Sequence, residues 1–214
     1  MQLTTKNVGF FSGVIAFIFT VAFLIVQLLQ IVGILSFPID EILIYGTSLC
    51  VVIPFVFEML ALHYITPNRK KFWTHASLIF SVLYAIFVIV NYVVQLAAVI
   101  PAKLSGARSE MVSLEQSHQS LLWDFDVLGY IFMGIAMLVA LPSFERKGVQ
   151  RWVRVSFLAN ALITPLVAFV YFFPAFSTNL LFLGLPWAIT APFAMLMLAM
   201  MFKKNSKTNY TYEN

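Results

Sequence analysis

The sequence predicts an all-α protein, a polytopic transmembrane bundle of six spanning helices with both termini cytoplasmic. Hydrophobic residues make up 61% of its 214 residues and charged residues only 10%, against about a quarter in an ordinary soluble domain. The apolar stretches are continuous rather than alternating, which favours helices over a β-barrel. About 20 apolar residues at about 1.5 Å each cross a hydrocarbon core about 30 Å thick, so each long stretch can span a membrane.

Polar breaks between the apolar stretches set the bounds of the expected helices. The longest polar stretch is 101–122, and nothing in it suggests a soluble domain, so we expect one transmembrane domain over 1–214. Trp73, Trp123 and Trp152 fall at expected helix ends, as is typical of rings that prefer the headgroup region. Helices are expected at about 9–35, 42–65, 73–100, 123–144, 153–173 and 180–202, with an external loop at 101–122 and a cytoplasmic tail at 203–214.

The distribution of basic residues predicts the orientation of the helices. Eleven of the 13 lysines and arginines fall on one side of the six-helix arrangement, and only Lys103 and Arg108 fall on the other. The positive-inside rule therefore places both termini in the cytoplasm. The opposite, external side gathers six acids, namely Asp40, Glu41, Glu110, Glu115, Asp124 and Asp126.

Three short segments carry a family resemblance: VVQL at 93–96, DVLGY at 126–130 and LAN at 158–160. With the order of the surrounding segments, they make most of residues 60–200 similar to uncharacterised bacterial multi-pass integral membrane proteins of unknown function. The resemblance implies a multi-pass protein of the bacterial cell (inner) membrane. It implies no activity and no site residue, so function has to be inferred from the residues themselves.

Two local patterns concern helix contacts and the external loop. Gly9 and Gly13, in GFFSG, have the small-xxx-small spacing of a close contact between membrane helices. Apolar residues in SEMVSLEQSHQSLLWDF, residues 109–125, recur at three- and four-residue spacing. This second pattern fits either a short interfacial helix or a flexible linker with a few apolar residues.

Glu58 is a carboxyl group inside an apolar run, VVIPFVFEMLALHY at 51–64. It lies seven residues before the expected cytoplasmic end of its helix, and Asn160 lies seven residues into the fifth helix, so both are expected at one depth. An ionised carboxylate facing lipid is costly, so we expect Glu58 to be neutral, to face the bundle and to pair with Asn160. The pair fits either a polar clamp between helices or a protonatable group in a transport pathway.

A second polar group is expected in the outer half of the membrane, where amides and carboxylates converge near one depth. They line an acidic vestibule in one interpretation; in the other, the amides hold helices together and the aspartates cap the fourth helix. The candidate ligand-binding residues are Gln27, Gln30, Asn91, Gln95, Asp124 and Asp126.

Three functional hypotheses follow from these patterns. We favour a noncatalytic membrane protein that binds or passes a small molecule or cation through an outward-facing polar pocket. The first alternative is an intramembrane enzyme acting on a lipid or isoprenoid, with Glu58 or the Asp124 and Asp126 pair as acid or base. The second is a structural partner of another membrane protein.

Several site classes have no motif in the chain. Only three histidines are present, without zinc-ligand spacing, and no GxSxG nucleophile elbow or phosphate-binding loop occurs. We therefore expect no catalytic residue, no metal and no cofactor. The lipid bilayer is the expected partner, together with the small molecule or cation of the favoured hypothesis, and no nucleic acid is expected.

The orientation can be checked with a reporter fused after Asn214. Because eleven of the 13 basic residues fall on the side of the termini, a reporter that is active only in the cytoplasm should be active there. Activity of a periplasm-specific reporter at the same position would show that the orientation is wrong.

Overall fold

The computed structural model describes residues 4–118, 120–175 and 178–209, and these residues contain helices and no strand. Six helices are long and apolar enough to cross a membrane. The predicted all-α class and the six spanning helices are confirmed, and the chain is a multi-pass membrane protein. Its outer surface is apolar, with large side chains such as Ile25 and Leu162 more than half exposed where lipid tails would contact them.

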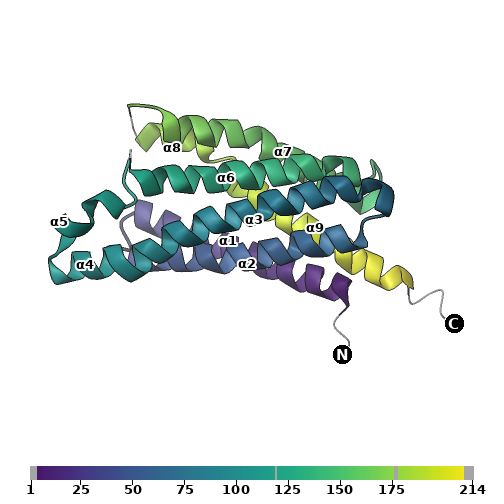
Figure 1. Ribbon diagram of the computed structural model, residues 1–214, viewed down its shortest axis with the longest axis horizontal. Helices are drawn as coiled ribbons and strands as arrows, with labels where there is room; N and C mark the ends of the chain where they lie inside the picture. Colours follow the sequence, from purple (N-terminus) through teal and green to yellow (C-terminus); the bar gives the residue numbers. More distant parts are fainter. Residues whose placement is uncertain (1–3, 119, 176–177, 210–214) are drawn as a thin grey trace.

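The helices run back and forth along the long axis of the molecule, so that the first turn of the first helix and the last turns of the last helix lie at the same end (Figure 1). Two of the spans are interrupted, one by a π turn and one by a break at Pro186. The helices are α1 (Thr5–Ile31), α2 (Ile39–Ile65), α3 (Lys71–Val94), α4 (Ile100–Ser105), α5 (Arg108–Met111), α6 (Leu121–Ala140), α7 (Gly148–Phe172), α8 (Thr178–Gly184) and α9 (Trp187–Asn209).

The third span is longer than the sequence predicts. A π turn at Gln95–Val99, in which the Ile100 N–H donates to the Gln95 carbonyl, carries α3 into α4. The turn absorbs Pro101, which has no N–H to donate and would otherwise interrupt the α-helical pattern. With α5 and a 3₁₀ turn at Val112–Leu114, helix therefore occupies much of the expected loop 101–122.

The sixth span also departs from its expected bounds of 180–202. It divides into α8 and α9 at Leu185 and Pro186, where the Leu185 N–H still donates to the Phe182 carbonyl but Pro186 cannot continue the pattern. At its other end α9 runs on to Asn209, so the expected tail 203–214 begins as helix. Residues 210–214 of that tail lie outside the described residues.

The six spans form a closed ring in chain order. Helix α1 packs on α2, α2 on α3, α3 on α6, α6 on α7, α7 on α9, and α9 returns to α1. Each span thus has its sequence neighbours as its spatial neighbours. Such a ring encloses a central axis that is lined by side chains and separated from the lipid.

Around the axis in the half of the ring that contains the described ends of the chain, large apolar side chains pack against one another. Met59, Met137, Phe157 and Phe202 come from four different helices and are at most 1% exposed. They belong to one continuous cluster of buried apolar side chains. This half is therefore a solid core.

Two glycines let α1 approach its neighbours closely in the solid half. A β-carbon at Gly9 would lie 2.7 Å from the Phe202 ring, and one at Gly13 would lie 2.8 Å from the Ala199 β-carbon and would collide with the Glu58 carboxyl. The small-xxx-small spacing thus marks a contact face, as predicted. At Gly9 this face contacts the Phe202 ring, and at Gly13 it contacts the Glu58 carboxyl group.

We predict that Gly13→Ala lowers the stability of the purified protein, whereas Gly46→Ala does not. An added methyl at Gly13 must displace Glu58 or α9, and overpacking of this kind costs about 1–3 kcal/mol. A methyl at Gly46, also in a helix, meets no atom within 4 Å. Thermal unfolding in detergent compares the two variants, and equal unfolding midpoints would contradict the close packing of α1.

Candidate functional site

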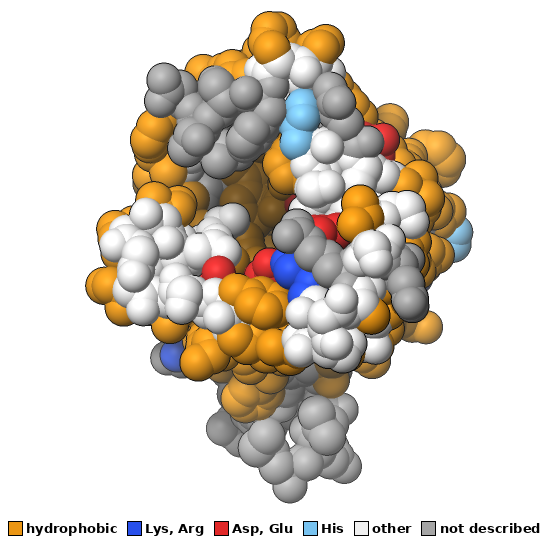
Figure 2. Space-filling view, turned by 90° about the vertical axis from the view of Figure 1, so that its left-hand side faces the viewer, with side chains coloured by type: hydrophobic (Ala, Val, Ile, Leu, Met, Phe, Trp, Pro, Cys, Tyr) orange, Lys and Arg blue, Asp and Glu red, His pale blue; other side chains and the backbone are white. Residues whose placement is uncertain are grey.

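The other half of the ring contains a cavity. It holds about 400 Å³ of empty space including its open end, and the centre of a water-sized molecule can reach about 30 Å³ of it. At about 10–15 Å³ for each water, this is room for two or three waters or a small organic group. Figure 2 looks at the end of the bundle that carries α4 and α5, and it shows a hollow with charged side chains near its mouth and apolar side chains within.

Two helices build one wall of the cavity from side chains one or two turns apart. Tyr84 and Tyr92 are eight residues apart on α3, and Asp126 and Tyr130 are four apart on α6. Spacings of four and eight residues place side chains on one face of a helix. Each helix therefore presents polar and aromatic side chains to the cavity on one face, together with Val88 of α3 and Met133 of α6.

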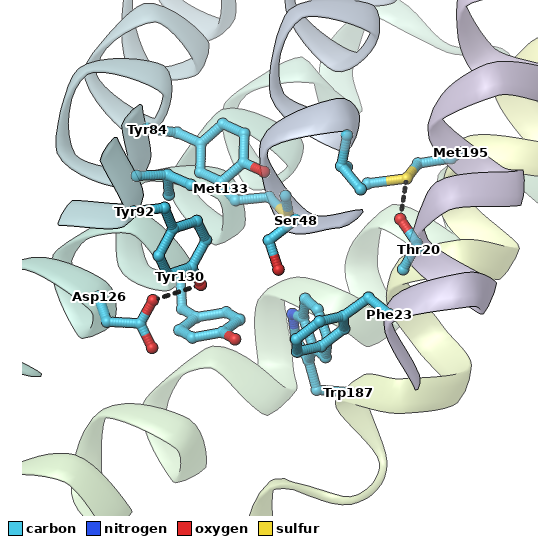
Figure 3. Close-up of a pocket in the computed structure, with 12 residues that line it drawn as sticks. Thr20, Phe23, Ser48, Tyr84, Tyr92, Asp126, Tyr130, Met133, Trp187 and Met195 are labelled. Atoms are coloured by element: carbon cyan, nitrogen blue, oxygen red, sulfur yellow. Dashed lines mark hydrogen bonds between the residues drawn. The ribbon is translucent and has the colours of Figure 1, made fainter. Parts of the chain in front are cut away.

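The opposite wall comes from α1, α2 and α9. Thr20 and Phe23 of α1 face Trp187 and Met195 of α9, and the Thr20 hydroxyl lies 3.3 Å from the Met195 sulfur. Ser48 of α2 also lines the cavity, and its hydroxyl projects toward the middle of the group (Figure 3). The cavity thus combines aromatic surface with a few hydroxyl groups.

Asp126 is the charged group of this cavity, and it is only 3% exposed. The Tyr92 hydroxyl donates to its Oδ1 at 2.7 Å, and the Tyr171 hydroxyl donates to its Oδ2 at 2.6 Å. Both carboxyl oxygens therefore act as acceptors, at the short distances of about 2.5–2.7 Å that hydroxyls make to a carboxylate. Tyr171 comes from α7, so this group links three helices of the ring.

Charged side chains also meet at the end of the ring where the cavity opens. The Lys103 ammonium group lies 2.6 Å from Glu41 and 3.2 Å from Glu115, and it stands over the Phe37 ring. Beside this network, at the start of α2, Asp40 accepts a hydrogen bond from Gln30 at 2.8 Å. Acids therefore outnumber the basic side chains that the structure describes in this group.

Two buried amides of the third span hold the segment that follows α5. Gln95 donates to the Leu114 carbonyl at 2.8 Å and accepts from the Gln116 N–H at 3.2 Å. Asn91 donates to the Gln116 side chain at 3.0 Å. The amides thus fix the segment 114–116 over the end of the bundle, where Glu115 reaches Lys103.

The structure brings only part of the predicted ligand-binding cluster to the cavity. Of its six members, Asp126 is the one that lines the cavity within the described chain. Gln30 binds Asp40, Gln27 is exposed, and Asp124 is half-buried in the first turn of α6. Asn91 of α3 and Gln95 of the π turn bind the segment 114–116 instead.

Glu58 and Asn160 are both buried, as predicted, but the structure gives them different surroundings. The Glu58 side chain is 0% exposed and lies against Gly13, and neither carboxyl oxygen has a hydrogen-bond partner among the described residues. Asn160 instead contacts the Met137 sulfur at 3.2 Å and accepts from the Thr190 hydroxyl at 3.1 Å. The predicted hydrogen bond between Glu58 and Asn160 is not formed.

The aromatic residues of the cavity were not among the predicted site residues, which were all charged or amide side chains. The missed signal was present, since Tyr84 and Tyr92 share a helix face, as do Asp126 and Tyr130. Trp187 carries a second signal, because it follows Pro186 at a break in the sixth span. A search for aromatic stripes beside an intramembrane acid would have found most of the cavity.

Comparison of the chain with protein-family models, with curated proteins and with solved structures gives no match. The inference of function therefore rests on the geometry of the cavity.

Proposed function

We propose that this membrane protein binds or passes a small molecule or cation through the cavity at the acidic end of its ring. The observation that best supports this proposal is the cavity itself. A purely structural bundle gains stability by packing its axis throughout, as this chain does around Phe202. The other half instead keeps a hollow beside a buried carboxylate, Asp126.

The charges around the mouth support a positively charged guest. Asp40, Glu41 and Glu115 gather at the mouth, and Asp126 lies in the cavity lining. Lys103 offsets part of this charge. A mouth with net negative charge raises the local concentration of cations and repels anions.

The enzyme hypothesis gains less support from the same residues. Asp124 and Asp126 are two positions apart, about 200° around a helix, and Asp124 is not in the cavity lining. Glu58 contacts Gly13 in the solid half of the ring and is also outside that lining. The residues proposed as acid and base therefore do not converge on one reaction space.

The location and orientation remain part of the proposal. The resemblance of VVQL, DVLGY and LAN to bacterial multi-pass membrane proteins supports the inner membrane. The placement of the basic residues supports cytoplasmic termini, and hence an acidic end that faces the outside. In this arrangement the cavity receives its guest from outside the cell.

A thermal-unfolding screen tests the proposed binding. The purified protein is heated in detergent with choline, with its neutral isostere 3,3-dimethylbutan-1-ol, and with the anion 3,3-dimethylbutanoate. A ligand at about ten times its Kd stabilises by about 1.4 kcal/mol, which raises the midpoint by about 3–6 °C for a chain of this size. We expect such a rise with at least one of these solutes.

Two phenylalanine variants on one helix serve as test and control. Ser48→Phe fills the cavity and should abolish the rise, whereas Cys50→Phe changes an exposed position and should preserve it. The proposal fails if none of the solutes raises the midpoint, or if the rise persists unchanged in Ser48→Phe.

A further inference from the structure

Trp187 stands at right angles to two other aromatic rings of the cavity. The Trp187 ring is edge-on to Phe23, with centroids 6.4 Å apart at 86°, and to Tyr130, with centroids 4.9 Å apart at 89°. Tyr84 and Tyr92 close the side opposite Phe23 (Figure 3). Perpendicular aromatic walls around one space are the arrangement by which proteins recognise quaternary ammonium groups.

The cavity also contains a carboxyl group that no described basic side chain pairs with. The described ion pairs involve Lys103 and Lys147, and none of them reaches Asp126. The two tyrosine hydroxyls stabilise the carboxylate by hydrogen bonding but bring no positive charge. A carboxylate removed from water without a counter-charge is costly, so a cationic guest would supply what the site lacks.

The donor set argues against a divalent metal ion as the guest. The described residues contain no group of three or more His, Cys, Asp or Glu side chains that could hold a metal. Calcium takes about six to eight oxygen ligands, whereas this cavity offers one carboxylate with both oxygens already bonded. Its walls are instead mostly aromatic and apolar, which suits a cation that carries its own hydrocarbon groups.

We infer that the cavity binds a small organic ammonium ion, with its positive charge beside Asp126 and its alkyl groups against the aromatic walls. This inference rests on the proposed function and specifies the ligand class. The space available limits the guest to a headgroup of about the size of trimethylammonium, equivalent to two or three waters. The hydroxyl group of Ser48 lies where it can contact a short polar tail.

Choline and 3,3-dimethylbutan-1-ol separate charge from shape, because they differ only in whether nitrogen or carbon carries the three methyl groups. Their binding to the purified full chain in detergent is measured by titration calorimetry. We expect choline to bind at least about tenfold more tightly, because desolvated cation–π contacts favour the ammonium ion over its neutral isostere. This comparison needs no variant, so it does not depend on how a mutant folds.

Two aspartate variants on α6 then test which carboxylate the bound ammonium ion lies beside. Asp126→Asn should weaken choline at least about tenfold and leave the neutral isostere nearly unchanged, whereas Asp124→Asn, outside the cavity lining, should leave both unchanged. Thermal unfolding without ligand verifies that each variant is folded.

The failures of the two proposals can be told apart. If the neutral isostere binds as tightly as choline and Ser48→Phe abolishes both, the cavity is a binding site but the ammonium inference is wrong. Retention of full choline affinity in folded Asp126→Asn would also overturn the inference. If none of the solutes binds, both the inference and the proposed function fail.

Discussion

The interior of a bilayer offers no hydrogen-bond partners, so the polar side chains of this ring depend on one another. Asp126 shows how the chain meets this constraint, because tyrosines from two other helices each donate to one of its oxygens. Asn160 meets it with a methionine sulfur and a threonine hydroxyl. Since these contacts join different helices, satisfying the polar groups also holds the ring together.

The ring order explains why one half is solid and the other hollow. Gly9 and Gly13 allow α1 to approach Phe202, Ala199 and Glu58 closely, which closes the axis in the half near the chain ends. In the other half, the inward positions carry large rings that stand edge to face instead of interleaving. The cavity therefore follows from which side chains face the axis, and the carboxylate within it gives the cavity its chemical character.

The helices could be predicted from the sequence because membrane length and apolar composition determine them. Their ends were predicted less well where local chemistry intervened, as at the π turn before Pro101 and the break at Pro186. Neighbours across the ring could not be predicted. Glu58 and Asn160 have equal sequence distances from their helix ends, but their helices α2 and α7 stand on opposite sides of the ring, with two helices between them either way.

The candidate site was predicted only in part, because the sequence does not show which side chains become neighbours in the ring. Depth and charge identified Asp126, whereas the rotation of α1 about its axis decides that Gln30 meets Asp40 and Gln27 is exposed. A single sequence shows which face of a helix points inward only when several residues of one kind recur on that face. In this chain the aromatic residues recur on the faces that line the cavity, whereas the amides do not.

The central claim is that a water-accessible, cation-selective cavity lies inside this membrane-embedded ring. Its most direct test is the rate at which Ser48→Cys, in a Cys50→Ala background without other cysteines, reacts with small thiosulfonate reagents of opposite charge. The account predicts that the 2-aminoethyl reagent, an ammonium ion, modifies Cys at this position at least about tenfold faster than the 2-sulfonatoethyl reagent. Equal rates for the two reagents, or no reaction in the folded protein, would contradict it.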